Sequence, residues 1–148
     1  MKEEDVEYMK QQREDNREAV YLSTVLKNEL KEWCDNQGFS LKFITDTMIS
    51  YLCFSSSFSE EVIKKCIEFF NDTRKETMFS TIGVSINQKR SFTSWFELNF
   101  KKKIPDFTKK DHTYRLVVDT IVKLFLTNKE IRKEILTFST NEILSKID

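Results

Sequence analysis

Two stretches of this chain, 73 positions apart, have similar patterns of residue types. Residues 39–52 and 112–125 share Asp-Thr outright, at Asp46 and Asp119, and the surrounding apolar positions match in type. The similarity continues at an offset of 69, where residues 61–69 align with residues 130–138. A unit that cannot bury its own apolar face usually buries it against its copy. The repeat therefore predicts two similar units, at about 17–72 and 81–140, packed together in one domain over residues 17–148.

The alternative is that two unrelated amphipathic helices resemble each other by chance. The shared start of the two stretches favours duplication, because Ser40 and Thr113 are both helix N-cap types. Each is followed two residues later by a cation, Lys42 or Arg115.

The chain contains few residues that interrupt helices. It has two Gly and one Pro in 148 residues, together with 13 Phe that supply bulky core side chains. This composition favours long helices over a protein of many strands and turns. We predict a mainly α fold with a short antiparallel β-ribbon, preceded by a flexible acidic arm at residues 1–16.

Composition also excludes several classes of protein. No apolar run approaches the roughly 20 residues of a membrane span, and the charged N-terminus lacks a signal peptide, so we expect a cytoplasmic protein. Three cysteines without a Cys-x-x-Cys pair indicate reduced packing residues. His112 is the single histidine, and the chain has neither a glycine-rich phosphate loop nor metal-ligand spacing. We therefore expect no enzyme activity, no metal and no cofactor. Asp46 and Asp119 are interpreted as making helix-surface or interhelix polar contacts, in preference to forming a catalytic carboxylate pair.

The first copy has the clearer local pattern. Residues 17–23 alternate as a short strand, and apolar spacing then indicates a helix that stops at Gly38. Ser40 is expected to cap a second helix to Phe54, and Ser59 to cap a third over about 60–70.

The second copy repeats this order. Residues 81–87 alternate as a strand, with Ile82, Val84 and Ile86 on one side. A helix with Ser91 as a possible cap follows, and further helices are expected near 113–126 and 129–138.

The order of strand, helix, glycine turn and Ser-capped helix resembles the ribbon-helix-helix family of DNA-binding proteins, the Arc and MetJ class. The resemblance covers residues 17–54 well and 81–126 more loosely. The residues that carry it are Val20-Tyr-Leu, Leu26, Leu30, Trp33, Gly38-Phe-Ser40, Ile44, Met48, Ile49 and Leu52.

The resemblance implies a ribbon whose outer side chains enter the major groove of DNA, with the start of the second helix on phosphate. The groove-facing positions would be Arg17, Ala19, Tyr21 and Ser23 in one strand, and Thr81, Gly83, Ser85 and Asn87 in the other. Phosphate would be held near Ser40 and Thr113, helped by Lys42 and Arg115. A basic stretch that includes Lys89 and Arg90 would add positive charge. One chain would supply both strands as a monomeric pseudo-dimer, or two chains would form a homodimer.

The leading hypothesis is thus a DNA-binding regulator, or an accessory factor for plasmid or phage DNA. The first alternative is a helical protein-interaction module, an adaptor or inhibitor of a host protein. It is suggested by the aromatic cluster Phe92, Trp95, Phe96 and Phe100, although aromatic residues at helical spacing usually face a core. A second alternative is an all-α bundle in which the duplication is purely architectural.

Overall fold

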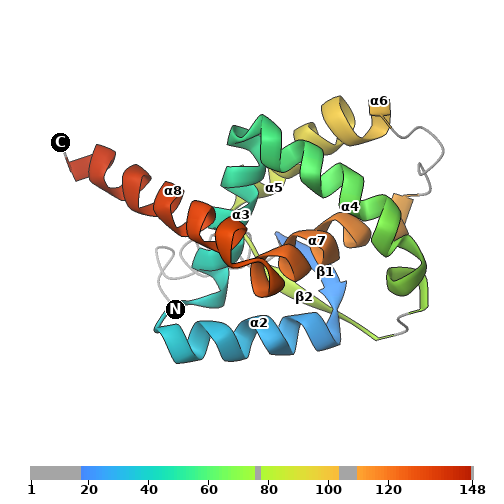
Figure 1. Cartoon of the computed structure of the whole chain (residues 1–148), viewed down its shortest axis with the longest axis horizontal. Helices are drawn as coiled ribbons and strands as arrows, with labels where there is room; N and C mark the ends of the chain where they lie inside the picture. Colours follow the sequence, from blue (N-terminus) through green and yellow to red (C-terminus); the bar gives the residue numbers. More distant parts are fainter. Residues whose placement is uncertain (1–17, 76–77, 104–109, 148) are drawn as a thin grey trace, which may run out of the picture.

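Two short strands from distant parts of the chain pair beside a helical body. The computed structural model describes residues 18–75, 78–103 and 110–147 (Figure 1). Strand β1 (Ala19–Ser23) is antiparallel to β2 (Phe79–Gly83), with Val20 opposite Ile82 and Tyr21 opposite Thr81. The prediction of a mainly helical protein with a small antiparallel ribbon is confirmed. The acidic arm lies outside the described residues.

Helices follow each strand. After β1 come α2 (Thr24–Gln37), α3 (Leu41–Phe54) and α4 (Ser56–Lys75). After β2 come α5 (Ile86–Trp95), the π-helical turn η1 (Phe96–Phe100), α6 (Lys101–Lys103), α7 (Lys110–Thr127) and α8 (Lys129–Ile147).

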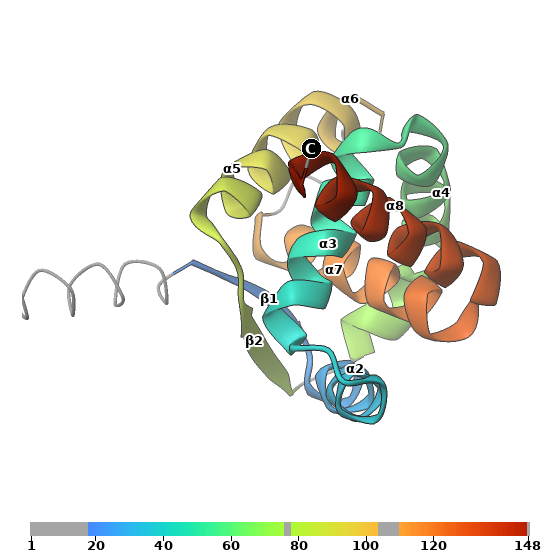
Figure 2. The ribbon, with the colours of Figure 1, turned by 90° about the vertical axis from the view of Figure 1, so that its left-hand side faces the viewer.

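The ribbon covers one side of the helical body. Val20, Leu22 and Ile82 on its inner face, together with Val84 just beyond β2, are buried in the core. Helix α7 packs against β1, and α4 packs against α7. Figure 2 shows the ribbon at the left of the view, with α2 at one end and α5 at the other. The outer face of the ribbon is therefore the part of the sheet that helices leave open.

The turn between α2 and α3 forms as the sequence predicts. Gly38 ends α2 in the left-handed region, with φ +79°. Glycine adopts this conformation without the steric cost that a Cβ imposes. Two residues later the Ser40 hydroxyl accepts a hydrogen bond from the Phe43 amide and caps α3.

The second strand and the helix after it begin earlier than predicted. We expected the strand at 81–87, but β2 ends at Gly83 and α5 begins at Ile86. Ser85 precedes the helix and Ser91 lies within it, so the proposed cap at Ser91 is wrong. The reason is a contact distant in sequence, because Asp46 binds both the amide and the hydroxyl of Ser85.

Two other helix starts also differ from prediction. Helix α4 begins at Ser56, after the Ser55 hydroxyl accepts a hydrogen bond from the Phe58 amide. Ser59 is instead buried inside α4, where its oxygen accepts a hydrogen bond from the Trp95 indole at 2.8 Å. Helix α7 begins at Lys110, so Thr113 lies within the helix instead of capping it.

The aromatic cluster of α5 and η1 faces inward. Phe92, Trp95, Phe96 and Phe100 are each no more than 5% exposed. Phe96 stacks on Tyr114 of α7, with 4.2 Å between ring centroids. The interpretation of this cluster as core is confirmed, and it offers no surface anchor to a partner.

Candidate nucleic-acid interface

The outer face of the ribbon carries the most exposed side chains of the sheet. Tyr21 is 61% exposed and lies opposite Thr81, which is also exposed. The next outward pair is Ala19 and Gly83. These four residues were predicted to face outward, and the structure places them there. Arg17, the predicted base-reading cation, lies outside the described residues.

Ser23 and Ser85 were expected on this outer face, but both bind carboxylates from other helices. The Asp119 carboxylate accepts hydrogen bonds from the Ser23 amide at 2.8 Å and the Ser23 hydroxyl at 2.6 Å. The Asp46 carboxylate accepts from the Ser85 amide at 3.0 Å and the Ser85 hydroxyl at 2.6 Å. Each serine is the N-cap of a helix, α2 or α5. Their placement on the outer face is therefore wrong.

The two carboxylates thus perform the same task in different surroundings. A carboxylate near the start of a helix satisfies free amides and complements the helix dipole. Asp119 is 1% exposed, and burial raises the pKa of its carboxyl group. Asp46 is only half-buried. Helix-surface or interhelix polar contacts were expected for both aspartates, and each makes the interhelix kind with a serine that caps another helix.

Helix α3 presents its predicted phosphate-binding residues to solvent. Ser40 and Lys42 are both exposed at the start of the helix. Lys42 precedes Asp46 by four residues and so shares its face of α3. Asp46 binds Ser85, two residues beyond Gly83, so Lys42 lies one helical turn from that contact.

Arg115, the residue that corresponds to Lys42, is not at the surface. It is 6% exposed, and its guanidinium lies 3.5 Å from the centre of the Phe79 ring. Phe79 lies at the start of β2, and its ring both makes this cation–π contact and covers the Arg115 guanidinium. The expectation that Arg115 is an exposed phosphate ligand is wrong. The side chain of Thr113 lies outside the described part of the chain.

The predicted basic stretch divides into structural and exposed residues. Lys89 is half-buried and its amine donates a hydrogen bond to the Ala19 carbonyl at 2.8 Å. Burial lowers the pKa of this amine. Arg90 and Asn87 are exposed on α5, where Asn87 belongs to a helix and not to the strand. Lys89 therefore fastens α5 to the ribbon, whereas Arg90 is available to solvent.

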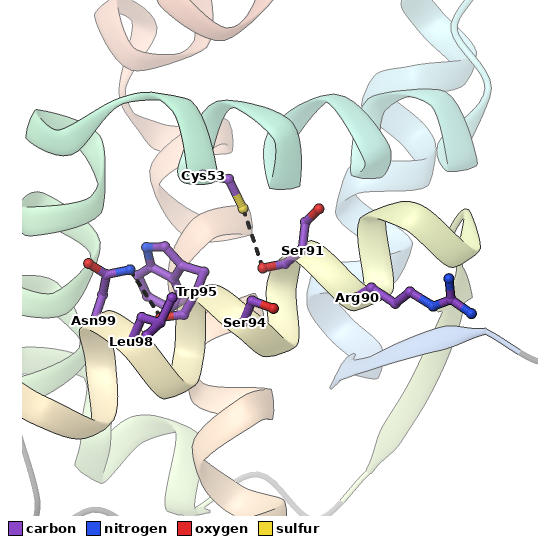
Figure 3. A pocket seen from close by; sticks show the side chains of 7 residues that line it. All are labelled: Cys53, Arg90, Ser91, Ser94, Trp95, Leu98 and Asn99. Carbon is purple, nitrogen blue, oxygen red and sulfur yellow. Dashed lines mark hydrogen bonds between the residues drawn. The ribbon is translucent and has the colours of Figure 1, made fainter.

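A shallow pocket of about 390 Å³ lies between α3 and the α5–η1 segment. It is lined by Cys53, Arg90, Ser91, Ser94, Trp95, Leu98 and Asn99. Figure 3 shows the Arg90 side chain pointing away from the others, while the Cys53 thiol donates to the Ser91 carbonyl at 3.6 Å. Burial raises the pKa of Cys53, which favours the thiol over the reactive thiolate. Nothing in this lining indicates nucleophilic chemistry.

Comparisons with protein families, with curated proteins and with solved structures give no match to this chain. Within the described residues, no group of three or more His, Cys, Asp or Glu side chains could hold a metal ion. Among the same residues, no helix is both long and apolar enough to cross a bilayer.

Sequence reasoning missed the pairing of each serine with its aspartate. Two signals for it were present. Ser23 and Ser85 lie 62 positions apart, and Trp33 and Trp95 have the same separation.

Proposed function

We propose that this chain binds double-stranded DNA by placing the outer face of the β1–β2 ribbon in the major groove. The observation that carries the proposal is the exposed face with Tyr21 and Thr81, on a two-stranded ribbon anchored by its inner face. The major groove of B-DNA is wide enough for such a ribbon. Tyrosine and threonine hydroxyls both donate and accept hydrogen bonds. The proposed role is that of a regulator or an accessory factor in DNA handling.

The proposal includes the duplication. We infer that β1 to α4 and β2 to α8 are two copies related by an approximate two-fold axis. In support, the aspartate of each copy binds the serine cap of the other, so the two contacts exchange under such an axis. Trp33 and Trp95 occupy equivalent places in the first helix of each copy. One chain then supplies both strands of the ribbon and binds as a monomer.

Positive charge beside the ribbon supports DNA in preference to a neutral partner. Lys42 and Arg90 are exposed, and Lys42 lies in the first turn of α3. Such helix starts bind phosphate readily. The zero net charge of the whole chain means that attraction to DNA depends on this local arrangement.

A fluorescence anisotropy titration with a pool of random duplexes tests the proposal. Affinity should fall with salt by roughly 0.9 log units of the binding constant per log unit of salt for each phosphate contact. Lys42→Glu should weaken binding and reduce the salt slope by about 1.

Lys64→Glu is the matched control. Lys64 is exposed on α4, which packs on α7 away from the ribbon (Figure 2). It should bind DNA as the unmodified chain does. Binding that is absent, or unchanged between low and physiological salt, would end the proposal.

A helical protein-interaction module is the second candidate, and exposed apolar side chains favour it. Phe54 and Leu98 are both largely exposed, and Leu98 lines the shallow pocket. Such groups suit a partner groove. Leu98→Asp would leave DNA binding intact and would abolish binding to a protein partner at this face.

A further inference from the structure

We propose that the DNA site of this chain is asymmetric, with the base contacts gathered on one side of the ribbon's approximate two-fold axis. This inference rests on the proposed DNA-binding function and names the class of duplex involved, a non-palindromic one. The inference follows because the serine caps and the strand pairing are symmetric about this axis, whereas the side chains on the outer face of the ribbon are not.

The position of the axis comes from equivalent residues. The serine caps, 62 positions apart, make Val20 equivalent to Ile82, and these two residues also lie opposite each other in the ribbon. An axis that exchanges the copies therefore passes between them. The outward pairs next to the axis, one on each side, are Tyr21 with Thr81 and Ala19 with Gly83.

The two outward pairs have different chemistry. Tyr21 and Thr81 both carry hydroxyls, so this side can make hydrogen bonds to base edges in the groove. Ala19 and Gly83 have no polar side-chain atom. Only the backbone atoms of this pair are polar, and the Ala19 carbonyl already accepts a hydrogen bond from Lys89.

The cations that flank the ribbon also differ between its two ends, and the exposed cation is not at the end that carries the hydroxyls. Lys42 is exposed one helical turn before Asp46, which binds Ser85 just beyond Gly83. Its equivalent, Arg115, is buried against Phe79 near the Tyr21–Thr81 end. Phosphate contacts specify position and not sequence. One end of the ribbon is thus equipped to hold the DNA backbone, and the other to read bases.

Selection of bound sequences from a randomised duplex library tests the inference. We expect a non-palindromic consensus with its information on one side of the centre. Tyr21→Ala and Thr81→Ala should each lower affinity for the selected duplex roughly tenfold and relax the same base positions. A palindromic consensus, or binding without sequence preference, would overturn the inference and leave the proposed function standing. Failure of the unmodified chain to bind any duplex would overturn both.

A designed variant tests the same inference by adding the missing hydroxyl side chains to the other side of the axis. Ala19→Thr with Gly83→Tyr makes the two outward pairs equivalent. Gly83 tolerates a side chain, because a Cβ at this position meets nothing within 4 Å and its φ is ordinary. We expect this double variant to select a palindromic consensus that repeats the original half-site. Circular dichroism and urea unfolding verify that it folds. A folded variant that selects the original one-sided consensus would show that these side chains do not read the bases.

Discussion

Asp119 of α7 and Ser23 at the end of β1 are 96 positions apart, yet the carboxylate accepts two hydrogen bonds from that one residue. The contact fastens α7 to the junction between the ribbon and α2. Asp46 and Ser85 make the same pair of bonds at the other end of the ribbon, between α3 and α5. The ribbon is consequently held at both ends by helices from opposite halves of the chain.

We expect removal of the two carboxylates to have unequal effects on stability. Asp119→Ala leaves a buried amide and hydroxyl without their acceptor, which costs about 2 kcal/mol of unfolding free energy. Asp46→Ala is the matched variant, and its cost should be nearer to about 1 kcal/mol because water reaches the half-buried Ser85. Urea denaturation of both variants measures the difference. Equal losses would indicate that burial does not set the strength of these contacts.

The pH dependence of stability should identify the charge state of Asp119. Burial raises the pKa of this carboxyl group, and hydrogen bonds from Ser23 with the nearby cations Lys123 and Arg115 offset only part of that effect. The folded state therefore binds the proton more tightly than the unfolded state. The resulting stabilisation is fully present below the unfolded pKa and is lost as pH rises through the folded pKa.

Asp119→Asn does not titrate at this position, so the stability advantage of the unmodified chain over this variant should shrink as pH rises. Urea denaturation of both proteins between about pH 3 and pH 7 measures it. A gap that widens with rising pH would mean that the fold favours the carboxylate.

The two glycines should respond differently to alanine. Gly38 adopts φ +79°, where a Cβ is strained, so Gly38→Ala should cost about 1 kcal/mol. Gly83 has an ordinary φ and open space where a Cβ would lie. Gly83→Ala should stay within about 0.5 kcal/mol of the unmodified chain. Thermal unfolding of both variants compares them, and an equal loss at both positions would contradict the role of the left-handed turn.

The two tryptophans should differ in their access to a soluble quencher. Trp95 is buried and its indole donates to Ser59, whereas Trp33 is half-buried between Phe39 and Phe125. Trp33→Phe leaves only Trp95, and Trp95→Phe leaves only Trp33. Acrylamide should quench the second variant more strongly. Stronger quenching of Trp95 would place the aromatic cluster at the surface.

Local signals in the sequence predicted the turn between α2 and α3 well. The glycine stop at Gly38 and the Ser40 cap each act within a few residues, so they are visible without the fold. The second half was predicted less well, because the residue that starts α5 is selected by a distant carboxylate. Ser85 and Ser91 are equally good caps in isolation, and only Asp46 distinguishes them.

The candidate interface shows the same division. Alternation along the strands identified Tyr21 and Thr81 as outward residues. It gave no indication that Phe79 would cover Arg115, or that Lys89 would bind the ribbon instead of solvent. Charge in a sequence does not reveal exposure, because burial depends on which aromatic ring or carbonyl the fold brings near each cation.

By itself, the sequence determined the helical content and the small ribbon, since periodicity, capping and glycine placement act over one or two turns of chain. The tertiary structure decided where the second strand ends, which serines cap helices and which cations remain exposed. Those outcomes depend on groups dozens of residues apart, and their hydrogen bonds and ring contacts form only when the two halves of the chain pack together.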